Sequence, residues 1–436
     1  MFLIALLLHV LVGHGADWPQ WLGPGRDAVW REEGILRKFP ESGLKIRWRS
    51  PIRSGYTGPA VADGRVFVMD RKLAPGAKNP ENLFKRGSIP GNERILCLDQ
   101  KTGRVLWQHE YDSDYTVSYP KGPRATPSVS GNLVVCLGAE GDLHCLDTRN
   151  GEVQWIRRFK EEFGAKTPTW GFAAHPLLDG DRVISLVGGD GSAVVAFDRQ
   201  TGQEMWRALT TKDVAYCAPV IYEIGGVRQL IVWLIDAVHS LDPMTGQVYW
   251  SHKWGVRGGG SIAIPRLLGD RLFLSTFFNG SLMLRVNGKE QPEQLWISPK
   301  ITTKDTTFLH ALNCVPWLEG EHLYGVCNYG QFRCLQIQDG ERVWESLKPV
   351  GIEKPRRNAN AFIVRHEDRF ILCPDSGELV IAKLSPAGYE EIDRTRLIDP
   401  TDRDGGRPIV WSHPAFAGRC VFARNDREII CASLAQ

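Results

Sequence analysis

The sequence has no excess of charge of either sign. Its 53 Lys and Arg residues against 50 Asp and Glu residues leave a formal net charge of +3. A protein that wraps nucleic acid presents a strongly basic face, so this balance excludes that class and we expect no nucleic-acid partner. No apolar run reaches the ~20 residues that a membrane-crossing helix needs. We therefore expect no transmembrane span.

Several sequence motifs typical of catalytic or metal-binding sites are also missing. The 10 cysteines contain no C-x-x-C pair and no zinc-ligand spacing, and no G-x-S-x-G or Walker motif occurs. The sequence therefore identifies neither catalytic residues nor metal ligands. Methionine is scarce, at 5 residues, whereas 15 Trp and 45 Gly indicate tight turns and large apolar anchors rather than helices. An all-β protein is the expected class.

What is present begins with a short apolar stretch. Residues 1–16, MFLIALLLHVLVGHGA, combine an apolar run with small residues after it, as a secretory signal peptide does, although no Lys or Arg precedes the run. We predict export, to the periplasm or out of the cell. No cysteine follows the run, so the sequence shows no site for a lipid anchor.

A strand-turn-strand unit recurs through most of the chain, at intervals of 44 to 51 residues in its clear part. The clear copies are CLDQKTGRVLW ending at Trp107, CLDTRNGEVQW at Trp155, AFDRQTGQEMW at Trp206, SLDPMTGQVYW at Trp250 and CLQIQDGERVW at Trp344. Weaker copies end at Trp48 and Trp296 and near Tyr389. The Asp can accept hydrogen bonds from turn N–H groups, the Gly supplies a positive φ, and the Trp four residues later is expected to dock between neighbouring sheets.

Two further strands precede most of these hairpins, which gives four strands per unit. Units of ~40 to 50 residues with four strands are propeller blades, so we predict an eight-bladed all-β propeller. The final strands lack a Trp hairpin and Trp48 lacks preceding strands, so the two ends should share one blade. The expected organisation is a signal peptide (1–16), an N-terminal extension (17–45) and one propeller domain (46–436).

The D-x-x-T-G-x-x-x-W hairpins resemble the repeats of quinoprotein alcohol dehydrogenase-like propellers, a family that includes pyrroloquinoline-quinone (PQQ) dehydrogenases and the BamB-type outer-membrane assembly scaffold. The resemblance covers nearly the whole mature chain. DWPQWLGPGRDAVW near its start and GPRATPSV at 122–129 resemble exported PQQ-repeat proteins of planctomycete-type bacteria.

The resemblance implies two different functions. A quinoprotein dehydrogenase would hold PQQ with Ca²⁺ and use a carboxylate base, but the adjacent Cys-Cys pair and C-x-x-C-H module of those enzymes are missing. We therefore expect no cofactor and favour a non-catalytic, monomeric binding scaffold for a protein, peptide or glycan. A PQQ-dependent oxidoreductase is the alternative, and a hydrolase or lyase is a third reading.

Residues just before the recurring x-Pro should line the central funnel, because the innermost strand of each blade begins beside the channel. The expected lining is Tyr56, Arg124, Thr126, His175, Tyr216, Ser261, His310, Asn313, Asn358, Asn360, Ser412 and His413, with Arg257 and Arg357 near the entrance. Arginines there would suit an anionic ligand, while the alternative is that these residues solvate a water-filled channel.

Three insertions offer rim loops for a partner, at 71–94, 296–310 and 384–411. Cys97, Cys145, Cys334 and Cys431 share a repeat position just before or near the hairpin, so we expect buried thiols, with the pairs Cys136–Cys145 and Cys420–Cys431 as alternatives.

Overall fold

The repeated hairpins form as their composition predicts. In the first clear copy the Asp99 carboxylate accepts hydrogen bonds from the backbone N–H groups of Lys101 (3.1 Å) and Thr102 (2.8 Å). The Gly103 N–H donates to the Asp99 carbonyl oxygen (2.9 Å), and Gly103 has a φ of +71°. A left-handed residue at this position closes the turn, which is why the repeat keeps a glycine there.

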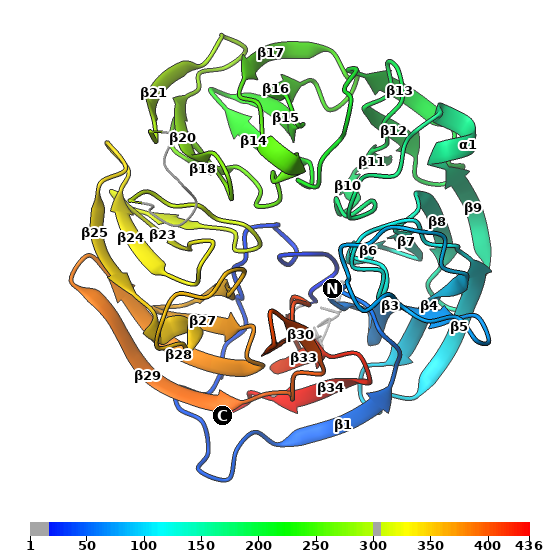
Figure 1. Cartoon of the computed structure of the whole chain (residues 1–436), viewed down its shortest axis with the longest axis horizontal. Coiled ribbons are helices and arrows are strands. Elements are labelled where there is room, and N and C mark those ends of the chain that lie inside the picture. The colour runs from blue at the N-terminus through cyan, green and yellow to red at the C-terminus, as the bar shows by residue number, and fades with distance from the viewer. Residues whose placement is uncertain (1–16, 300–306) are drawn as a thin grey trace, which may run out of the picture.

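These hairpins belong to eight four-stranded antiparallel sheets that surround a common axis, as a computed structural model of the chain shows (Figure 1). It describes residues 17–299 and 307–436. The predicted eight-bladed propeller is confirmed. The expected signal peptide, and part of the 296–310 insertion, lie outside the described residues. Among the helices of the described part, none is long and apolar enough to cross a membrane.

Blades are numbered here along the chain, and each begins with its innermost strand. Blade 1 comprises β2 (Ala60–Ala62), β3 (Arg65–Leu73), β4 (Gly91–Asp99) and β5 (Val105–Asp112). Blade 2 comprises β6 (Ser128–Ser130), β7 (Leu133–Leu137), β8 (Asp142–Asp147) and β9 (Val153–Arg158), and helix α1 (Phe159–Phe163) follows it. Blade 3 comprises β10 (Leu177–Asp179), β11 (Arg182–Leu186), β12 (Val194–Asp198) and β13 (Glu204–Ala208). Blade 4 comprises β14 (Val220–Ile224), β15 (Val227–Trp233), β16 (Ala237–Leu241) and β17 (Val248–Lys253).

The second half repeats this plan with two additional short elements. The 3₁₀ turn η1 (Arg257–Gly259) precedes blade 5, which comprises β18 (Arg266–Leu268), β19 (Arg271–Thr276), β20 (Gly280–Arg285) and β21 (Glu293–Ile297). Blade 6 comprises β22 (Trp317–Glu319), β23 (His322–Val326), β24 (Phe332–Gln336) and β25 (Arg342–Ser346), followed by η2 (Lys348–Val350). Blade 7 comprises β26 (Ala361–His366), β27 (Arg369–Pro374), β28 (Glu378–Ser385) and β29 (Gly388–Arg396), and the hairpin β30 (Asp402–Asp404) and β31 (Arg407–Ile409) follows.

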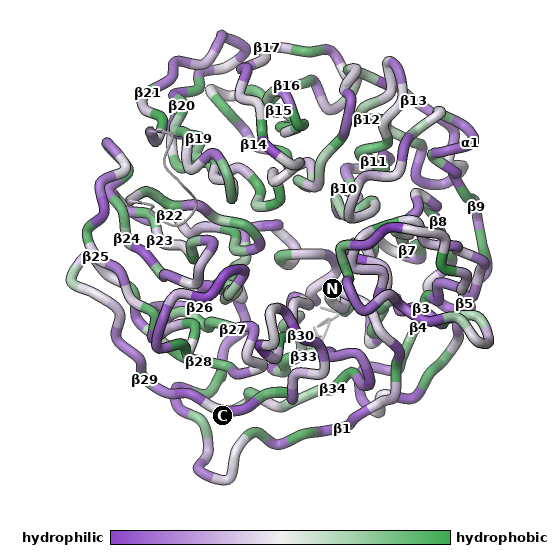
Figure 2. Tube along the Cα trace, in the orientation of Figure 1, coloured by the Kyte–Doolittle hydropathy of each residue, from purple (hydrophilic) through white to green (hydrophobic). Residues whose placement is uncertain are grey.

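Blade 8 closes the ring as expected. Its inner strands are β32 (Ala415–Ala417), β33 (Cys420–Arg424) and β34 (Glu428–Ser433), and its outer strand is β1 (Ile46–Pro51). Trp48 pairs with Cys431 across β1 and β34. Figure 2 shows hydrophilic residues along much of the outer rim, whereas the strands inside the blades are largely apolar. All ten cysteines are buried as free thiols.

The repeat tryptophans join each blade to the next. The indole N–H of Trp48, Trp107, Trp155, Trp206, Trp296 and Trp344 donates to a backbone carbonyl oxygen of the following blade, at 2.8 to 3.2 Å. Trp250 differs, because the next hairpin is the degenerate copy. Its indole N–H donates to Gln229 Oε1 (3.2 Å), and the Gln229 amide donates in turn to the carbonyl oxygen of Gly288. Gln229 therefore relays the contact that the other tryptophans make directly.

Residues 17–36, called here the hub segment, cross the centre of the ring before the chain turns outward to β1 (Figure 1). Trp18 forms a bridge with Val61 of blade 1, and the Val129 N–H of blade 2 donates to the Pro19 carbonyl oxygen (2.8 Å). On the far side the Trp30 N–H donates to the Arg365 carbonyl oxygen of blade 7 (2.8 Å). The hub segment thus connects blades that lie far apart in the sequence.

Candidate functional site

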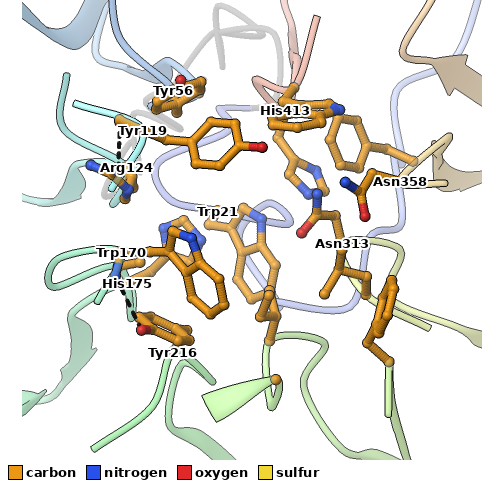
Figure 3. Close-up of a pocket in the computed structure, with 18 of the residues that line it drawn as sticks. Trp21, Tyr56, Tyr119, Arg124, Trp170, His175, Tyr216, Asn313, Asn358 and His413 are labelled. Atoms are coloured by element: carbon orange, nitrogen blue, oxygen red, sulfur yellow. Dashed lines mark hydrogen bonds between the residues drawn. The ribbon is translucent and has the colours of Figure 1, made fainter. Parts of the chain in front are cut away.

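A cavity of about 260 Å³ lies where the eight blades converge (Figure 3). Each blade contributes residues that come just before its innermost strand. In blade order these contributions include Gly58, Thr126, His175, Tyr216, Ile262, Asn313, Asn358 and His413. Loops add Phe84, Tyr119, Trp170 and Trp411. Because every blade brings the segment just before its innermost strand to the central axis, a repeat sequence builds a single site.

Most of the residues expected to line the funnel do border this cavity. They are Tyr56, Arg124, Thr126, His175, Tyr216, Asn313, Arg357, Asn358 and His413. Whether they bind a ligand stays a prediction.

The other expected residues lie elsewhere in the described structure. Arg257 is near the site, with its guanidinium 5.7 Å from the ring centre of the lining residue Phe278. His310 is buried behind the wall, with Nδ1 3.1 Å from the Phe277 carbonyl oxygen. Asn360 is buried, and its backbone N–H donates to Asp375 (3.1 Å). Ser261 and Ser412 are likewise buried and do not border the cavity. Side chains that point into the blades rather than toward the axis cannot be recognised from the x-Pro position alone.

The floor of the cavity comes from Trp21 of the hub segment, a residue that the sequence did not single out. Its side chain is only 4% exposed. The indole stacks on His175 with ring centres 4.3 Å apart, and it meets His413 edge-on at 5.6 Å (Figure 3). The motif DWPQWLGPGRDAVW contained the signal, since it places several tryptophans and glycines outside any repeat.

Arg26 anchors this floor. It is buried, and its guanidinium donates to Gln20 Oε1 (2.9 Å) and to the carbonyl oxygens of Pro219 (3.1 Å) and Pro176. Burial lowers the pKa of Arg26 to about 9. By bonding to carbonyl groups of blades 3 and 4, Arg26 holds the hub segment against the ends of their inner strands.

The two histidines beside Trp21 are neutral at neutral pH. Burial lowers the pKa of His175 well below its usual value, and the nearby Arg26 charge lowers it further. Burial lowers the pKa of His413 to about 3, against an opposing hydrogen bond to the Asn313 backbone. His175 Nδ1 accepts a hydrogen bond from the Thr126 N–H (2.8 Å), which places its proton on Nε2. Positive charge in the cavity therefore comes from arginine alone.

Acidification should destabilise the protein through His413. Its pKa falls from about 6.5 when unfolded to about 3 when folded, so the unfolded chain binds the extra proton and stability is lost as the pH falls below about 6.5. Between pH 7 and 4.5 this loss should be about 2.5 kcal/mol. Urea unfolding at both pH values should show a smaller loss in His413→Gln than in the parent chain. Equal losses of stability in the two proteins would contradict the assignment of this pH dependence to His413.

Two arginines face the cavity without a carboxylate partner. Arg124 donates to the carbonyl oxygens of Gly122 (2.8 Å), Ser118 (2.7 Å) and Tyr119 (2.6 Å), and its guanidinium lies 5.3 Å from the Tyr56 ring centre. Arg357 lies 5.3 Å from the Phe277 ring centre and forms no ion pair with any described residue. Because carbonyl groups and rings leave the formal charges uncancelled, both arginines remain available to an anion.

The cavity continues into a second hollow, called here the mouth, which shares Phe84, Arg357 and Asn358 with it. The remaining mouth residues are Arg356, Asp404, Gly405, Gly406 and Arg407. They come from the loop after η2 and from the β30–β31 hairpin, part of the 384–411 insertion. Arg407 is held by Asp375 through two hydrogen bonds of 2.6 and 2.8 Å. Phe84, from the 71–94 insertion, is 55% exposed and packs edge-on against Tyr119.

Some buried polar atoms of the lining have no hydrogen-bond partner in the described part of the chain. Trp21 Nε1 and Thr126 Oγ1 are two of them, on residues 4% and 2% exposed. A buried donor left unpaired costs about 1–3 kcal/mol. Both residues border the cavity, so a ligand bound there would lie beside them.

The lining does not fit a quinone with calcium. No Asp or Glu occurs among the lining residues, and the described residues contain no cluster of three or more His, Cys, Asp or Glu that could hold a metal. Calcium is held by carboxylate and carbonyl oxygens, and alcohol oxidation needs a carboxylate base. The described lining therefore offers no carboxylate, either as a calcium ligand or as that base.

Comparison with known proteins gives consistent matches. The family described as outer membrane protein assembly factor BamB matches residues 91–346. The outer membrane protein assembly factor BamB of Bordetella pertussis is 26% identical over 314 residues, which cover 62% of this chain and 74% of that protein. In Salmonella typhimurium the protein of the same name is 24% identical over 173 residues, or 36% of this chain and 39% of that protein.

Solved structures show the same architecture. BamB from Moraxella catarrhalis superposes with a TM-score of 0.55 at 15% identity, covering 88% of this chain and 96% of that one. Quinohemoprotein alcohol dehydrogenase from Comamonas testosteroni gives a TM-score of 0.63 at 12% identity, covering 96% of this chain and 80% of that one. At such identities the likeness concerns the fold alone.

Proposed function

Because the chain belongs to the outer membrane protein assembly factor BamB family, we propose that it is an exported binding scaffold without catalytic activity. The proposed partner, a protein, peptide or glycan, binds at the cavity mouth and the loops around it. The observation that carries this proposal is the composition of the cavity, which combines aromatic rings and two unpaired arginines with no carboxylate. Such a lining supports binding of an anionic group and lacks an acid-base pair.

The oxidoreductase alternative is supported only by the fold that this chain shares with quinohemoprotein alcohol dehydrogenase. Related folds carry unrelated activities, so the site decides. A hydrolase or lyase would need a base, and the two cavity histidines have their pKa values lowered by burial. Both catalytic readings therefore rank below the scaffold.

Photo-crosslinking in the native envelope would test the scaffold role. A photoreactive phenylalanine replaces Phe84 at the mouth, and the control places it at Met244, which is 51% exposed on the β16–β17 hairpin. We expect discrete adducts from position 84 and none of the same mass from position 244. Equal adducts from both sites, or no adducts at all, would count against a partner at the mouth.

A separate assay with the purified chain tests for catalytic activity. Purified chain is mixed with PQQ and Ca²⁺ and assayed for dye-linked oxidation of alcohols and sugars. No turnover is expected, because the lining lacks a carboxylate base. Turnover above that of PQQ and Ca²⁺ alone would replace the scaffold with the oxidoreductase.

A further inference from the structure

The cavity presents hydrogen-bonding groups of both kinds around an apolar floor. Trp21 forms the floor, and the hydroxyls of Thr126 and Tyr56 and the amides of Asn313 and Asn358 stand around it. Hydroxyl groups both donate and accept, and an amide side chain does the same through its two ends. A ligand that fits this lining has an apolar face for the rings and alternating donors and acceptors along its edge.

A sugar ring has this distribution of groups. Its axial C–H bonds make an apolar face, and its hydroxyls lie around the edge. A planar aromatic ligand without polar substituents would place few hydrogen-bonding groups against the hydroxyls and amides. Trp21 and Thr126 border the cavity, and the buried atoms Trp21 Nε1 and Thr126 Oγ1 have no hydrogen-bond partner in the described part of the chain. A sugar hydroxyl bound against these two residues would supply one.

The charged residues of the lining indicate which class of sugar would bind. Arg124 and Arg357 both border the cavity, and none of the described residues that line it carries a negative charge. Asp404 at the mouth contacts the lining, 3.2 Å from the Asn358 amide and 3.4 Å from the Tyr119 hydroxyl. Asp402 and Asp426 act electrostatically on Tyr56 but do not border the cavity. An uncharged sugar would leave both guanidinium groups without an anion, whereas a carboxylate can take two parallel hydrogen bonds from one of them.

We propose that the cavity binds a hexuronate unit, the six-carbon acidic sugar of anionic saccharides, with its ring over Trp21 and its carboxylate on Arg357 or Arg124. This inference rests on the proposed scaffold function and names the chemistry that its central site recognises. The size of the cavity, about 260 Å³, suits one or two sugar units rather than a folded segment of protein.

The test compares two probes that differ only in the acid group, D-glucuronate and D-glucose. Binding to the full mature chain is followed by tryptophan fluorescence, since Trp21, Trp170 and Trp411 border the cavity, and by saturation-transfer NMR. We expect glucuronate to bind at least about tenfold more tightly than glucose, with affinity that decreases as salt is added. Benzoate serves as the planar carboxylate and should bind more weakly than glucuronate.

Two conservative variants place the sugar in the cavity. Arg357→Gln removes an exposed guanidinium that makes no ion pair, and we expect about a tenfold loss of glucuronate affinity with glucose binding unchanged. Thr126→Val removes the unpartnered hydroxyl and should weaken both sugars. Arg104→Gln, on the exposed β4–β5 hairpin outside the cavity, is the matched control and should change neither. Unchanged thermal unfolding of each variant excludes a folding defect.

The outcomes separate this inference from the scaffold function. Glucuronate binding that is lost in Arg357→Gln and kept in Arg104→Gln supports it. Equal binding of glucose and glucuronate, or tighter binding of benzoate, overturns it. If no sugar binds while Phe84 still crosslinks to a partner, the hexuronate site is refuted and the scaffold stands; if crosslinking fails as well, both fail.

Discussion

A chain shortened to begin at Glu41 should lose the closed, cooperatively folded ring. It keeps β1, so blade 8 still has four strands, but it lacks the whole hub segment, including Trp18, Trp21 and Trp30, which are 3%, 4% and 2% exposed. Replacing one buried Trp by Ala costs about 3–5 kcal/mol. Three such losses approach the whole stability of a typical domain, about 5–15 kcal/mol. Circular dichroism during thermal unfolding should show an early, broad transition.

Point variants and an added peptide test whether the loss of stability comes from the contacts of the hub segment rather than from shortening the chain in general. Trp30→Ala alone should cost about 3–5 kcal/mol, because its ring lies 5.1 Å from those of His366 and Phe416. Its neighbour Arg31 is 56% exposed, and among the described residues its ion pair is with Asp27, so Arg31→Ala should change stability by less than about 0.5 kcal/mol. A peptide of residues 17–40, added in excess, should raise the unfolding temperature of the shortened chain by mass action.

A shortened chain that unfolds cooperatively at the same denaturant concentration as the parent would contradict this role. The expectation follows from connectivity. Without the hub segment, the ring is closed only by the β1–β34 pairing and by contacts between neighbouring blades. When the hub segment is present, blades 1, 2, 7 and 8 all bond to one continuous segment of chain that crosses the axis. One of these bonds runs from the Leu36 N–H to the Leu434 carbonyl oxygen (2.8 Å).

The fold could be predicted because its determinants are local and repeated. Each hairpin carries its own Asp, Gly and Trp within eleven or so residues, and several copies give the same answer independently. The closure of the ring followed from strands missing at the two ends. Even the wall of the cavity was largely predictable, since Thr126, His175 and His413 occupy corresponding positions in blades 2, 3 and 8.

The floor of the cavity could not be predicted in this way. Trp21 lies outside the repeat, so no second copy indicates where its side chain points. Its position depends on Arg26, whose bonds to Pro176 and Pro219 join residues 150 and 193 positions apart in the sequence. The mouth depends likewise on the β30–β31 hairpin, held by Arg407 and Asp375. Such contacts between distant segments have no periodic signature, and the residues that define the site are therefore harder to predict than the blades that carry it.

The second large prediction concerns the interface between blades 3 and 4. It compares two glycines of blade 4 that share a backbone conformation but differ in what surrounds them. Gly246 and Gly226 both lie in hairpin turns with φ values of +73° and +74°. A Cβ at Gly246 would lie 2.5 Å from the Trp206 ring, whereas a Cβ at Gly226 would meet nothing within 4 Å. Both alanine variants incur the left-handed backbone cost, about 1–2 kcal/mol. Only Gly246→Ala also forces the docked indole to move.

Gly246→Ala should therefore lose about 3–5 kcal/mol in all, since overpacking adds about 1–3 kcal/mol and displacement weakens the bond from Trp206 Nε1 to the Pro243 carbonyl oxygen (3.2 Å). Urea unfolding of both variants measures the difference, in which the backbone term cancels. Equal losses would mean that the indole gives way freely and that the tryptophan contact contributes little between blades. A larger loss for Gly246→Ala would show that the repeat keeps its glycine for two reasons, the turn and the neighbouring ring, which is why Gly and Trp recur together.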